Sequence, residues 1–376
     1  MYLFFIMNIL FLTTHLNIGG ISSYILSLSA GLRKRGHSLF VASSGGELEG
    51  SLQAEGVICL RIPINTKSEI NLPKLIRSCR ILRPFIAEHT IGLLHSHTRV
   101  TQVLGCLAGR YSRIPHVSTC HGFFKNRLSR RMFPCWGERV IAVSGSVQEH
   151  LAHDFCLDVK MIRLVYNGID ADRFAPCAAL SPEKKTEKKK AAGLPESPVV
   201  GIVARLSDVK GHRFLIEAMS IAVKKIPAAH LLIVGDGKMR ADLKSLVASL
   251  GIQKNVSFVP SVQDTVTLLS CMDVFVMPSL KEGLGLSLME AMACGLPVIG
   301  SDIGGIRNLI RDHENGLLVN PEDSHALSEA ILVLLADKVK AALLGKNAKD
   351  FINREFSLEK MAEQTEAVYR EVYREI

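Results

Sequence analysis

Residues 278–305 read PSLKEGLGLSLMEAMACGLPVIGSDIGG and, directly after a predicted strand, begin with a glycine-bearing loop and a short helix. An apolar run ends at Met277, and Leu286–Ala293 consists of strong helix formers. The backbone N–H groups at the start of this helix lack intrahelical partners, and glycine allows a ligand to approach the backbone closely. The stretch therefore predicts a phosphate site at a helix N-terminus.

Two glutamates bracket this loop and helix. Glu290 lies on the predicted helix, where its carboxylate could accept two hydrogen bonds from a ribose diol, and Glu282 precedes the first glycine. The structural alternative is an acidic residue that complements a helix dipole, followed by an ordinary core helix.

A second motif, GIVARLSDVKG at residues 201–211, places Arg205 and Lys210 just after a predicted buried strand. Arginine offers a planar fork for diphosphate oxygens, and lysine offers a point charge. Taken alone these would be surface charges. Because they share a domain with the Glu282–Glu290 element, we interpret them as a clamp for a diphosphate.

Outward from these motifs, short apolar runs alternate with helical patterns, which is typical of parallel β/α units. The predicted strands are Ile9–Thr13, Ser38–Ala42, Val57–Arg61, Ile91–His95, His116–Thr119, Arg139–Val143 and Lys160–Val165, then Val199–Val203, His230–Val234, Val256–Val259, Val274–Met277 and Pro297–Gly300. The pattern predicts two doubly wound sheets with ligands at the carboxyl ends of strands. Neither first strand is followed by G-x-G-x-x-G, which weakens a dehydrogenase interpretation.

The length of 376 residues also favours two domains, and the net charge of +9 is uneven. Residues 1–180 hold 20 Lys and Arg against 11 Asp and Glu, which accounts for the whole excess. An anionic partner of that half is therefore expected: a membrane surface, a phosphorylated acceptor or nucleic acid. The nine cysteines form no C-x-x-C motif and are typical of a reducing compartment. The apolar N-terminus lacks signal-peptide features, so a cytoplasmic location is expected, with peripheral contact at the inner face of the plasma membrane.

With these motifs in place, the chain resembles the family 4 retaining glycosyltransferases of the GT-B type. The resemblance rests on residues 201–211, VGDG at 234–237 and residues 278–305, and on NIGGISSYILSLSAGLRKRGH at 17–37, HSH at 95–97, CHGFF at 120–124 and YNGID at 166–170. It implies two facing Rossmann-like domains. The expected boundaries are 1–176 for acceptor binding, a charged solvated linker at 177–196, 197–356 for the nucleotide-sugar, and a C-terminal helix at 357–376 that packs back on the first domain.

The resemblance also implies roles for single residues. Arg205 and Lys210 would hold the donor diphosphate, Glu290 the ribose, and Glu282 the donor sugar, while His121 would lie at the reacting centre. The other expected donor-binding residues are Gly19, Gly20, Asn167, Gly235, Gly283, Leu284, Gly285 and Leu286. Leu284 replaces an aromatic residue often found there, which leaves the sugar specificity open.

The expected reaction is a retaining, metal-independent transfer of a hexosyl or N-acetylhexosaminyl group from a nucleotide-sugar, with a UDP-sugar favoured and no cofactor. The favoured acceptor is a lipid-linked or cell-surface polysaccharide or lipopolysaccharide precursor. His95 and His97 could begin a metal site, but no third ligand has suitable spacing. The D-x-D pattern of Asp170 and Asp172 is interpreted as helix capping.

Residues 123–136, FFKNRLSRRMFPCW, interleave basic and aromatic side chains. Such a stretch could dock on anionic lipid, or it could form an acceptor loop with no membrane role. Binding of nucleic acid is a third possibility, which is not expected. The docking residues proposed from this stretch are Lys125, Arg127, Arg130, Arg131 and Trp136.

Two other functions stay open at this point. A nucleotide-sugar epimerase on the same frame would consume its substrate without an acceptor. A sugar-nucleotide sensor would bind the donor without turnover.

Overall fold

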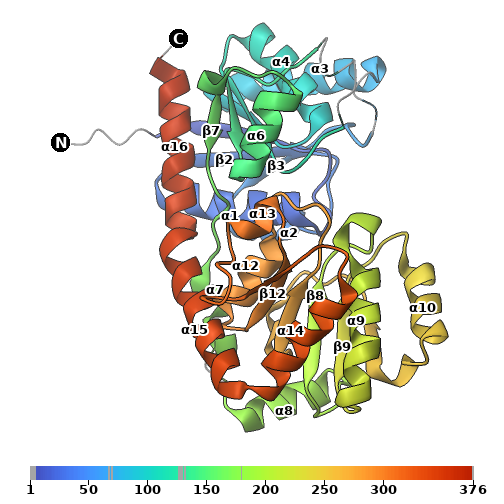
Figure 1. Cartoon of the computed structure of the whole chain (residues 1–376). Helices are drawn as coiled ribbons and strands as arrows, with labels where there is room; N and C mark the ends of the chain where they lie inside the picture. The colour runs from blue at the N-terminus through green and yellow to red at the C-terminus, as the bar shows by residue number, and fades with distance from the viewer. Residues whose placement is uncertain are drawn as a thin grey trace. The chain divides into compact units, whose positions relative to one another are not determined.

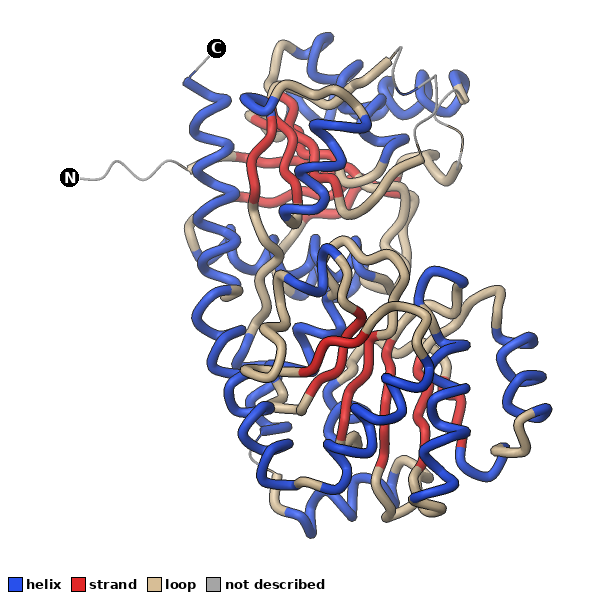
Figure 2. The backbone as a smooth tube through the Cα atoms, in the orientation of Figure 1, coloured by secondary structure: helices blue, strands red, loops and turns tan. Residues whose placement is uncertain are grey.

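The computed structural model describes residues 6–66, 68, 71–125, 130, 133–178 and 180–374, and it divides into two compact units. Unit 1 is Met1–Gly168 with Leu358–Ile376, and unit 2 is Ile169–Ser357. Each unit is built on one parallel sheet with helices on both of its faces (Figure 2). The predicted pair of Rossmann-like doubly wound domains is therefore confirmed.

The sheet of unit 1 has the strand order β3-β2-β1-β4-β5-β6-β7. Its strands are β1 (Asn8–Leu12), β2 (Ser38–Ser43), β3 (Ile58–Arg61), β4 (Leu93–Ser96), β5 (His116–Cys120), β6 (Arg139–Ala142) and β7 (Ile162–Leu164). Its helices are α1 (Gly20–Lys34), α2 (Glu49–Ala54), α3 (Leu72–Glu88), α4 (Arg99–Ser112), α6 (Gly145–Asp154) and α16 (Leu358–Arg374), with a 3-10 turn at Val159–Met161. Ile9, Leu10, Phe11 and Leu12 are fully buried, as a central parallel strand requires.

The sheet of unit 2 has the order β10-β9-β8-β11-β12-β13. Its strands are β8 (Val199–Val203), β9 (His230–Val234), β10 (Val256–Val259), β11 (Val274–Met277), β12 (Val298–Ser301) and β13 (Leu317–Val319). Its helices are α7 (Ala171–Ala178), α8 (Pro182–Ala191), α9 (His212–Lys225), α10 (Arg240–Ser249), α11 (Val266–Ser270), α12 (Leu286–Ala293), α13 (Gly304–Arg307), α14 (Ser324–Ala336) and α15 (Lys338–Glu355), with 3-10 turns at Asp208–Lys210 and Gln253–Asn255.

The C-terminal helix α16 belongs to unit 1, where it packs along α1 (Figure 1). Gly31 of α1 faces Ala362 so closely that a methyl group on Gly31 would lie 2.8 Å from the Ala362 Cβ. The buried carboxylate of Glu366 pairs with Arg35 of unit 1 and with Arg370 one turn along α16. Small residues and a buried ion pair together fix this helix in place.

The charged segment SPEKKTEKKK is not a solvated linker, as the sequence had suggested, but forms helix α8 within unit 2. Ser181 caps the helix by accepting a hydrogen bond from the Lys184 N–H. Lys185 and Lys189 lie one turn apart and bind the two oxygens of Asp273, at 2.8 and 2.7 Å. Charge therefore attaches this segment to the amino end of the central strand β11, which an apolar pattern could not reveal.

The strands expected from the apolar runs agree with the structure to within about two residues at each end, and β13 is the strand that was missed. Its three residues are too few to form a recognisable apolar run. Of the helices in the described ranges, none combines the length and apolar character that a membrane crossing requires.

Candidate functional site

The strand order of unit 2 reverses between β8 and β11, which are neighbours in the sheet. Loops that leave neighbouring strands in opposite directions open a crevice at the carboxyl end of a parallel sheet. The loop after β8 carries Arg205 and Lys210, and the loop after β11 carries Glu282. The topology therefore places both sequence motifs at the same switch point.

Backbone contacts hold these two loops together. The N–H of Leu280 donates to the carbonyl of Val209 at 2.9 Å. Gly211 has φ +69°, and a Cβ at this position would lie 1.8 Å from the Pro278 carbonyl oxygen. Because only glycine fits this conformation and this contact, Gly211 sets the spacing between the loops.

Neighbouring loops extend this backbone network. The N–H of Leu206 donates to the carbonyl of Asp236 at 2.9 Å, and the N–H of Gly235 donates to Val259 at the end of β10, also at 2.9 Å. On the other side, a methyl group on Gly305 would lie 2.4 Å from the carbonyl oxygen of Gly283. Loops from five strands thus form one connected edge of the sheet.

The side chains of Lys210 and Glu282 form an ion pair in this edge. Both are largely buried, with side-chain exposures of 20% and 13%. Ser279 also lies at hydrogen-bond distance from the same carboxylate oxygen, at 3.4 Å. Arg205 is exposed, and among the described residues it has no side-chain hydrogen bond or ion pair. The structure therefore brings Lys210 to Glu282 and leaves the Arg205 guanidinium available to a ligand.

Helix α12 begins directly after this pair. Gly285 precedes it with φ +98°, and the Gly285 carbonyl accepts from the N–H groups of Leu288 and Met289. The first turn has no acidic side chain. The N–H groups of Leu286 and Ser287 lie before the first intrahelical donor, so the helix offers them, with its positive dipole end, to an anion.

Glu290 lies in the middle of α12 and is paired with Thr265, whose hydroxyl donates to Oε2 at 2.9 Å. Burial raises the pKa of Glu290 above its ordinary value, while Thr265 and the positive charge of Arg173 oppose that rise. Sequence reasoning missed Thr265 because it belongs to no motif and precedes the short helix α11. A partly buried carboxylate with one hydroxyl partner keeps acceptor capacity for further donors.

His212, directly after Gly211, is another residue that the sequence did not single out. Its ring is buried and neither nitrogen has a hydrogen-bond partner among the described residues. Burial, with the nearby charge of Lys210, lowers the pKa of His212 to about 4. The imidazole is therefore neutral at physiological pH and adds no charge to the cluster.

In unit 1 the strand order reverses between β1 and β4. Gly19 and Gly20 lie where the loop after β1 enters α1, and His97 follows β4. His121 follows β5, with its Nε2 3.3 Å from Nδ1 of His97 and its ring edge-on to Tyr24 at 4.7 Å. Burial lowers the pKa of His121 to about 3, so this imidazole is neutral in the physiological range. Asn167 is buried, and its side-chain oxygen has no partner in the described chain.

The basic aromatic stretch behaves differently from the expectation of an exposed docking loop. Trp136 and Arg130 are only 3% and 7% exposed, and the Arg130 guanidinium lies 3.9 Å from the centre of the Phe124 ring. Both side chains pack in the core with Phe155 and are not available to a membrane. Lys125 is exposed, whereas Arg127 and Arg131 lie outside the described residues. Alternation of basic and aromatic residues does not distinguish a stacked core from a surface.

Both ring nitrogens of His95 are hydrogen-bonded: Nδ1 lies 2.6 Å from the Tyr369 hydroxyl and Nε2 lies 2.7 Å from the Thr119 hydroxyl. Neither nitrogen is left for a metal. Among the residues that the structure describes, no group of three or more His, Cys, Asp or Glu side chains could hold an ion. Asp172 lies in the first turn of α7.

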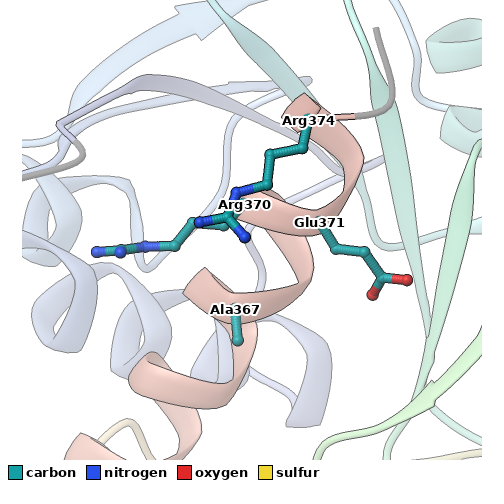
Figure 3. A pocket seen from close by; sticks show the side chains of 4 residues that line it. All are labelled: Ala367, Arg370, Glu371 and Arg374. Atoms are coloured by element: carbon teal, nitrogen blue, oxygen red, sulfur yellow. The ribbon is translucent and has the colours of Figure 1, made fainter.

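A surface hollow of about 380 Å³ runs along α16, lined by Ala367, Arg370, Glu371 and Arg374 (Figure 3). Glu371 pairs with Arg139 and Arg163, and Arg370 pairs with Glu366. Because Arg370 and Glu371 are already paired, we attribute the hollow to the packing of α16 and not to a ligand site.

Comparison with known proteins agrees with this geometry. Residues 183–351 match the family model described as "Glycosyl transferases group 1", and residues 18–173 match "Glycosyltransferase Family 4". The chain is 31% identical to the alpha-maltose-1-phosphate synthase of Mycolicibacterium smegmatis over 310 residues. The matched region covers 74% of this chain and 79% of the relative. It is 29% identical over 316 residues, 80% of each chain, to the UDP-Gal:alpha-D-GlcNAc-diphosphoundecaprenol alpha-1,3-galactosyltransferase of Escherichia coli.

Among solved structures, Anabaena HepE in complex with UDP-glucose superposes with a TM-score of 0.85 at 23% identity, covering 97% of this chain and all of HepE. Two family models, relatives along most of the chain and the same two-domain architecture lead to one conclusion. The chain belongs to the family 4 glycosyltransferases of the GT-B fold, enzymes that take their sugar from a nucleotide-sugar.

Proposed function

We propose that the protein transfers a hexosyl or N-acetylhexosaminyl group from a UDP-sugar to a lipid-linked or cell-surface polysaccharide or lipopolysaccharide precursor in the cytoplasm, with retention of the anomeric configuration and without a metal. The observation that carries the donor half is the edge of unit 2, where Arg205, Lys210 and the first amides of α12 lie on two adjoining loops. The E. coli galactosyltransferase, named for a UDP-sugar donor and a diphosphoundecaprenol acceptor, supports the choice of substrates.

Arg205 and the α12 amides would bind the diphosphate, since both are positive and neither is neutralised by a neighbouring carboxylate. Lys210 would join them when the incoming diphosphate competes with Glu282 for the ammonium group. The freed Glu282 carboxylate is then an acceptor for sugar hydroxyls next to the phosphate. The ion pair would thus hold both side chains in position before the donor arrives.

Glu290 would accept hydrogen bonds from the ribose hydroxyls, with Thr265 fixing the orientation of its carboxylate. The donor-binding roles proposed for Gly19, Gly20, Asn167, Gly235 and Gly283–Leu286 concern backbone or short side chains beside the phosphates and the sugar. His121 would hydrogen-bond to the donor sugar as a neutral imidazole.

In the proposed reaction, the bond between the anomeric carbon and the β-phosphate oxygen breaks first, and negative charge grows on the leaving diphosphate. Arg205, Lys210 and the α12 dipole would stabilise that charge. These positive groups would take the role that a metal ion has in other enzymes. The acceptor oxygen then bonds to the anomeric carbon on the face that the diphosphate leaves. Its proton passes to the departing phosphate, and the products are the glycoside and the nucleoside diphosphate.

The test is transfer from UDP-galactose, UDP-glucose, UDP-N-acetylglucosamine and GDP-mannose to a polyprenyl-diphosphate-linked N-acetylhexosamine, with and without EDTA. We expect a UDP-sugar to give an α-linked product, seen by proton NMR, at a rate that EDTA does not change. A β-linked product would exclude retention, and loss of activity with EDTA would exclude the metal-free mechanism. Conversion of the donor to an epimer in the absence of an acceptor would establish the epimerase alternative. Binding of the donor without turnover would establish the sensor alternative.

A further inference from the structure

His97 follows strand β4 and is enclosed by aromatic rings. The residue is 1% exposed, and its ring centre lies 5.2 Å from that of Phe11, 5.6 Å from that of Tyr24 and 4.3 Å from that of His95. The backbone N–H of His97 donates to the carbonyl of Leu12 at 2.9 Å, which ties the residue to the end of β1. Close packing on these sides holds the imidazole in one orientation.

The ring of His97 meets that of His121, which follows β5. Nδ1 of His97 lies 3.3 Å from Nε2 of His121, whereas Nε2 of His97 is buried and has no hydrogen-bond partner among the described residues. Burial lowers the pKa of both side chains, well below the ordinary value for His97 and to about 3 for His121. Both imidazoles are therefore neutral at physiological pH, so one nitrogen of this contact donates a hydrogen bond and the other accepts it.

Two arrangements of the protons are compatible with this contact. If His121 donated from Nε2, His97 would accept at Nδ1 and carry its own proton on Nε2, where a buried N–H would lack a partner. If His97 donates from Nδ1, its Nε2 is a bare acceptor. Buried N–H groups without a partner are rarer in proteins than under-satisfied acceptors, so the second arrangement is favoured. It leaves the proton of His121 on Nδ1, which makes no hydrogen bond within the described part of the chain. Because His121 is only partly buried, a ligand can reach this N–H.

We propose that His97 is a positioning residue that fixes the tautomer of His121. The hydrogen bond from Nδ1 of His97 to Nε2 of His121 holds the His121 proton on Nδ1, because the partner of one ring nitrogen decides which nitrogen is protonated. The Tyr24 ring, edge-on to His121 at 4.7 Å, holds the plane of the imidazole. His121 then presents an N–H, and not a lone pair, to a hydroxyl oxygen of the donor sugar.

The contact with the sugar rests on the proposed function, whereas the tautomer is a property of the empty protein. A purely structural role would require only that the His97 ring fill the space beside Phe11 and Tyr24. Leucine and asparagine have similar shapes, so they separate the two roles. The amide nitrogen introduced by His97→Asn can replace the Nδ1 donor, whereas His97→Leu removes it.

The tautomer is measured by long-range ¹H–¹⁵N correlation NMR of the full chain labelled in its histidine rings. The two signals are assigned by their loss in His97→Leu and in His121→Ala. We expect both imidazoles to be neutral and protonated at Nδ1 in the wild type. His121 should keep this tautomer in His97→Asn and should gain the Nε2–H form in His97→Leu. An Nε2–H tautomer of His121 in the wild type, or an unchanged tautomer in His97→Leu, would overturn the proposal.

The effect on the reaction is measured as transfer from a UDP-sugar and as affinity for UDP, which carries no sugar. His97→Leu should lower kcat/KM roughly five- to tenfold, the contribution of one neutral hydrogen bond, and should leave the affinity for UDP unchanged. His97→Asn should stay within about threefold of the wild-type rate. Equal losses in the two variants, or a matching loss of UDP affinity, would show a structural role instead. Each variant is first checked for an unchanged melting temperature, and the wild-type tautomer decides the question if His97→Leu does not fold.

A double-mutant cycle tests whether His97 acts through His121. In the His121→Ala background, His97→Leu should cause no further loss of transfer. Additive losses would overturn the proposal, because His97 would then act independently of His121. Sugar transfer by a chain with the opposite tautomer would refute this inference and leave the proposed function intact. The expected tautomer in a chain that transfers no sugar would refute the proposed function and, with it, the contact of His121 with the sugar.

Discussion

Replacing Glu290 with glutamine should weaken nucleotide binding and at the same time stabilise the empty protein. In the folded chain Glu290 is partly buried, and its carboxylate has one side-chain hydrogen bond, from Thr265 at 2.9 Å. Its remaining acceptor positions are those proposed for the two ribose hydroxyls. Glutamine keeps one acceptor oxygen but loses the charge, and its NH₂ group replaces the second acceptor.

The magnitude follows from the hydrogen bonds that are lost. A hydrogen bond to a charged group contributes about 1.5–3 kcal/mol. Losing one such bond and weakening the other predicts a loss of about 2–3 kcal/mol, which is roughly a 30- to 150-fold rise in Kd for UDP. The assay is isothermal titration calorimetry with UDP and with 2′-deoxy-UDP, which removes one of the two hydroxyls.

The effect of the Glu290→Gln substitution must depend on whether the nucleotide carries its 2′-hydroxyl. Wild type should prefer UDP over 2′-deoxy-UDP, and this preference should be smaller in Glu290→Gln. If the variant keeps the full wild-type preference for the ribose hydroxyl, the assignment of Glu290 is wrong, whatever happens to overall affinity. Thr265→Val should lower affinity for both nucleotides less strongly, because it disturbs only the orientation of the carboxylate.

The stability of the empty protein should change in the opposite direction. Burial raises the pKa of Glu290, so the folded state holds the proton more tightly than the unfolded state does. Between the unfolded and folded pKa values the folded chain binds more protons, and stability therefore falls as pH rises through that window. At neutral pH the partly desolvated charge of Glu290 destabilises the folded state, and glutamine removes this charge. A melting temperature below that of the wild type at neutral pH would contradict this reasoning.

The remaining predictions concern the loops, the diphosphate clamp and the α8 ion pairs. Gly211→Ala should destabilise the protein by more than about 3 kcal/mol and abolish UDP binding in calorimetry, because its Cβ would lie 1.8 Å from the Pro278 oxygen. The control Gly193→Ala, with φ +68° and no atom within 4 Å, should cost only about 1–2 kcal/mol by thermal unfolding. Arg205→Ala should lower the rate of sugar transfer by roughly 100-fold with an unchanged melting temperature, since the side chain is exposed; a wild-type rate would remove Arg205 from the clamp. Asp273→Asn should destabilise the protein by about 2–4 kcal/mol in urea unfolding, because it leaves Lys185 and Lys189 without their carboxylate. Burial of Asp273 opposes ionisation, but the two lysines hold its pKa below the ordinary value. The stability that the ionised Asp273 contributes is therefore present above its unfolded pKa, and it is lost as pH falls through its folded pKa. The difference between wild type and Asp273→Asn should therefore shrink in acid.

The sequence predicted the sheets well because strands buried on both faces are continuous apolar runs. Val199–Val203 and His230–Val234 agree with β8 and β9 at both ends. It could not predict that SPEKKTEKKK would be a helix, because the partner that holds Lys185 and Lys189 lies more than 80 residues away at Asp273. The same limit applies to Arg130, whose charge suggested a surface but whose guanidinium stacks on a buried ring.

In the candidate site, the glycines and charges of the two motifs were visible because their roles depend on local spacing. The pairing of Lys210 with Glu282 was not visible, since it joins positions 72 residues apart. Thr265 and His212 also became apparent only from the fold. Local chemistry is encoded within a motif, whereas the partner that orients each group is supplied by tertiary contact.

This distinction bears on how the substrate is selected. The proposed diphosphate clamp would use backbone amides and two cations, groups that any nucleoside diphosphate-sugar could satisfy. Specificity for the sugar would then come from side chains that touch hydroxyls, and in unit 2 Glu282 is a carboxylate next to the proposed phosphate site that could accept from them. Because Glu282 is also the counterion of Lys210, Glu282→Gln should change two properties together. It should free the ammonium group and tighten binding of UDP alone, while transfer from the intact UDP-sugar slows. If UDP binding weakened instead, the role of Glu282 would be to position Lys210. Glu282 would then not be a sugar ligand that stays paired with Lys210 until the donor binds.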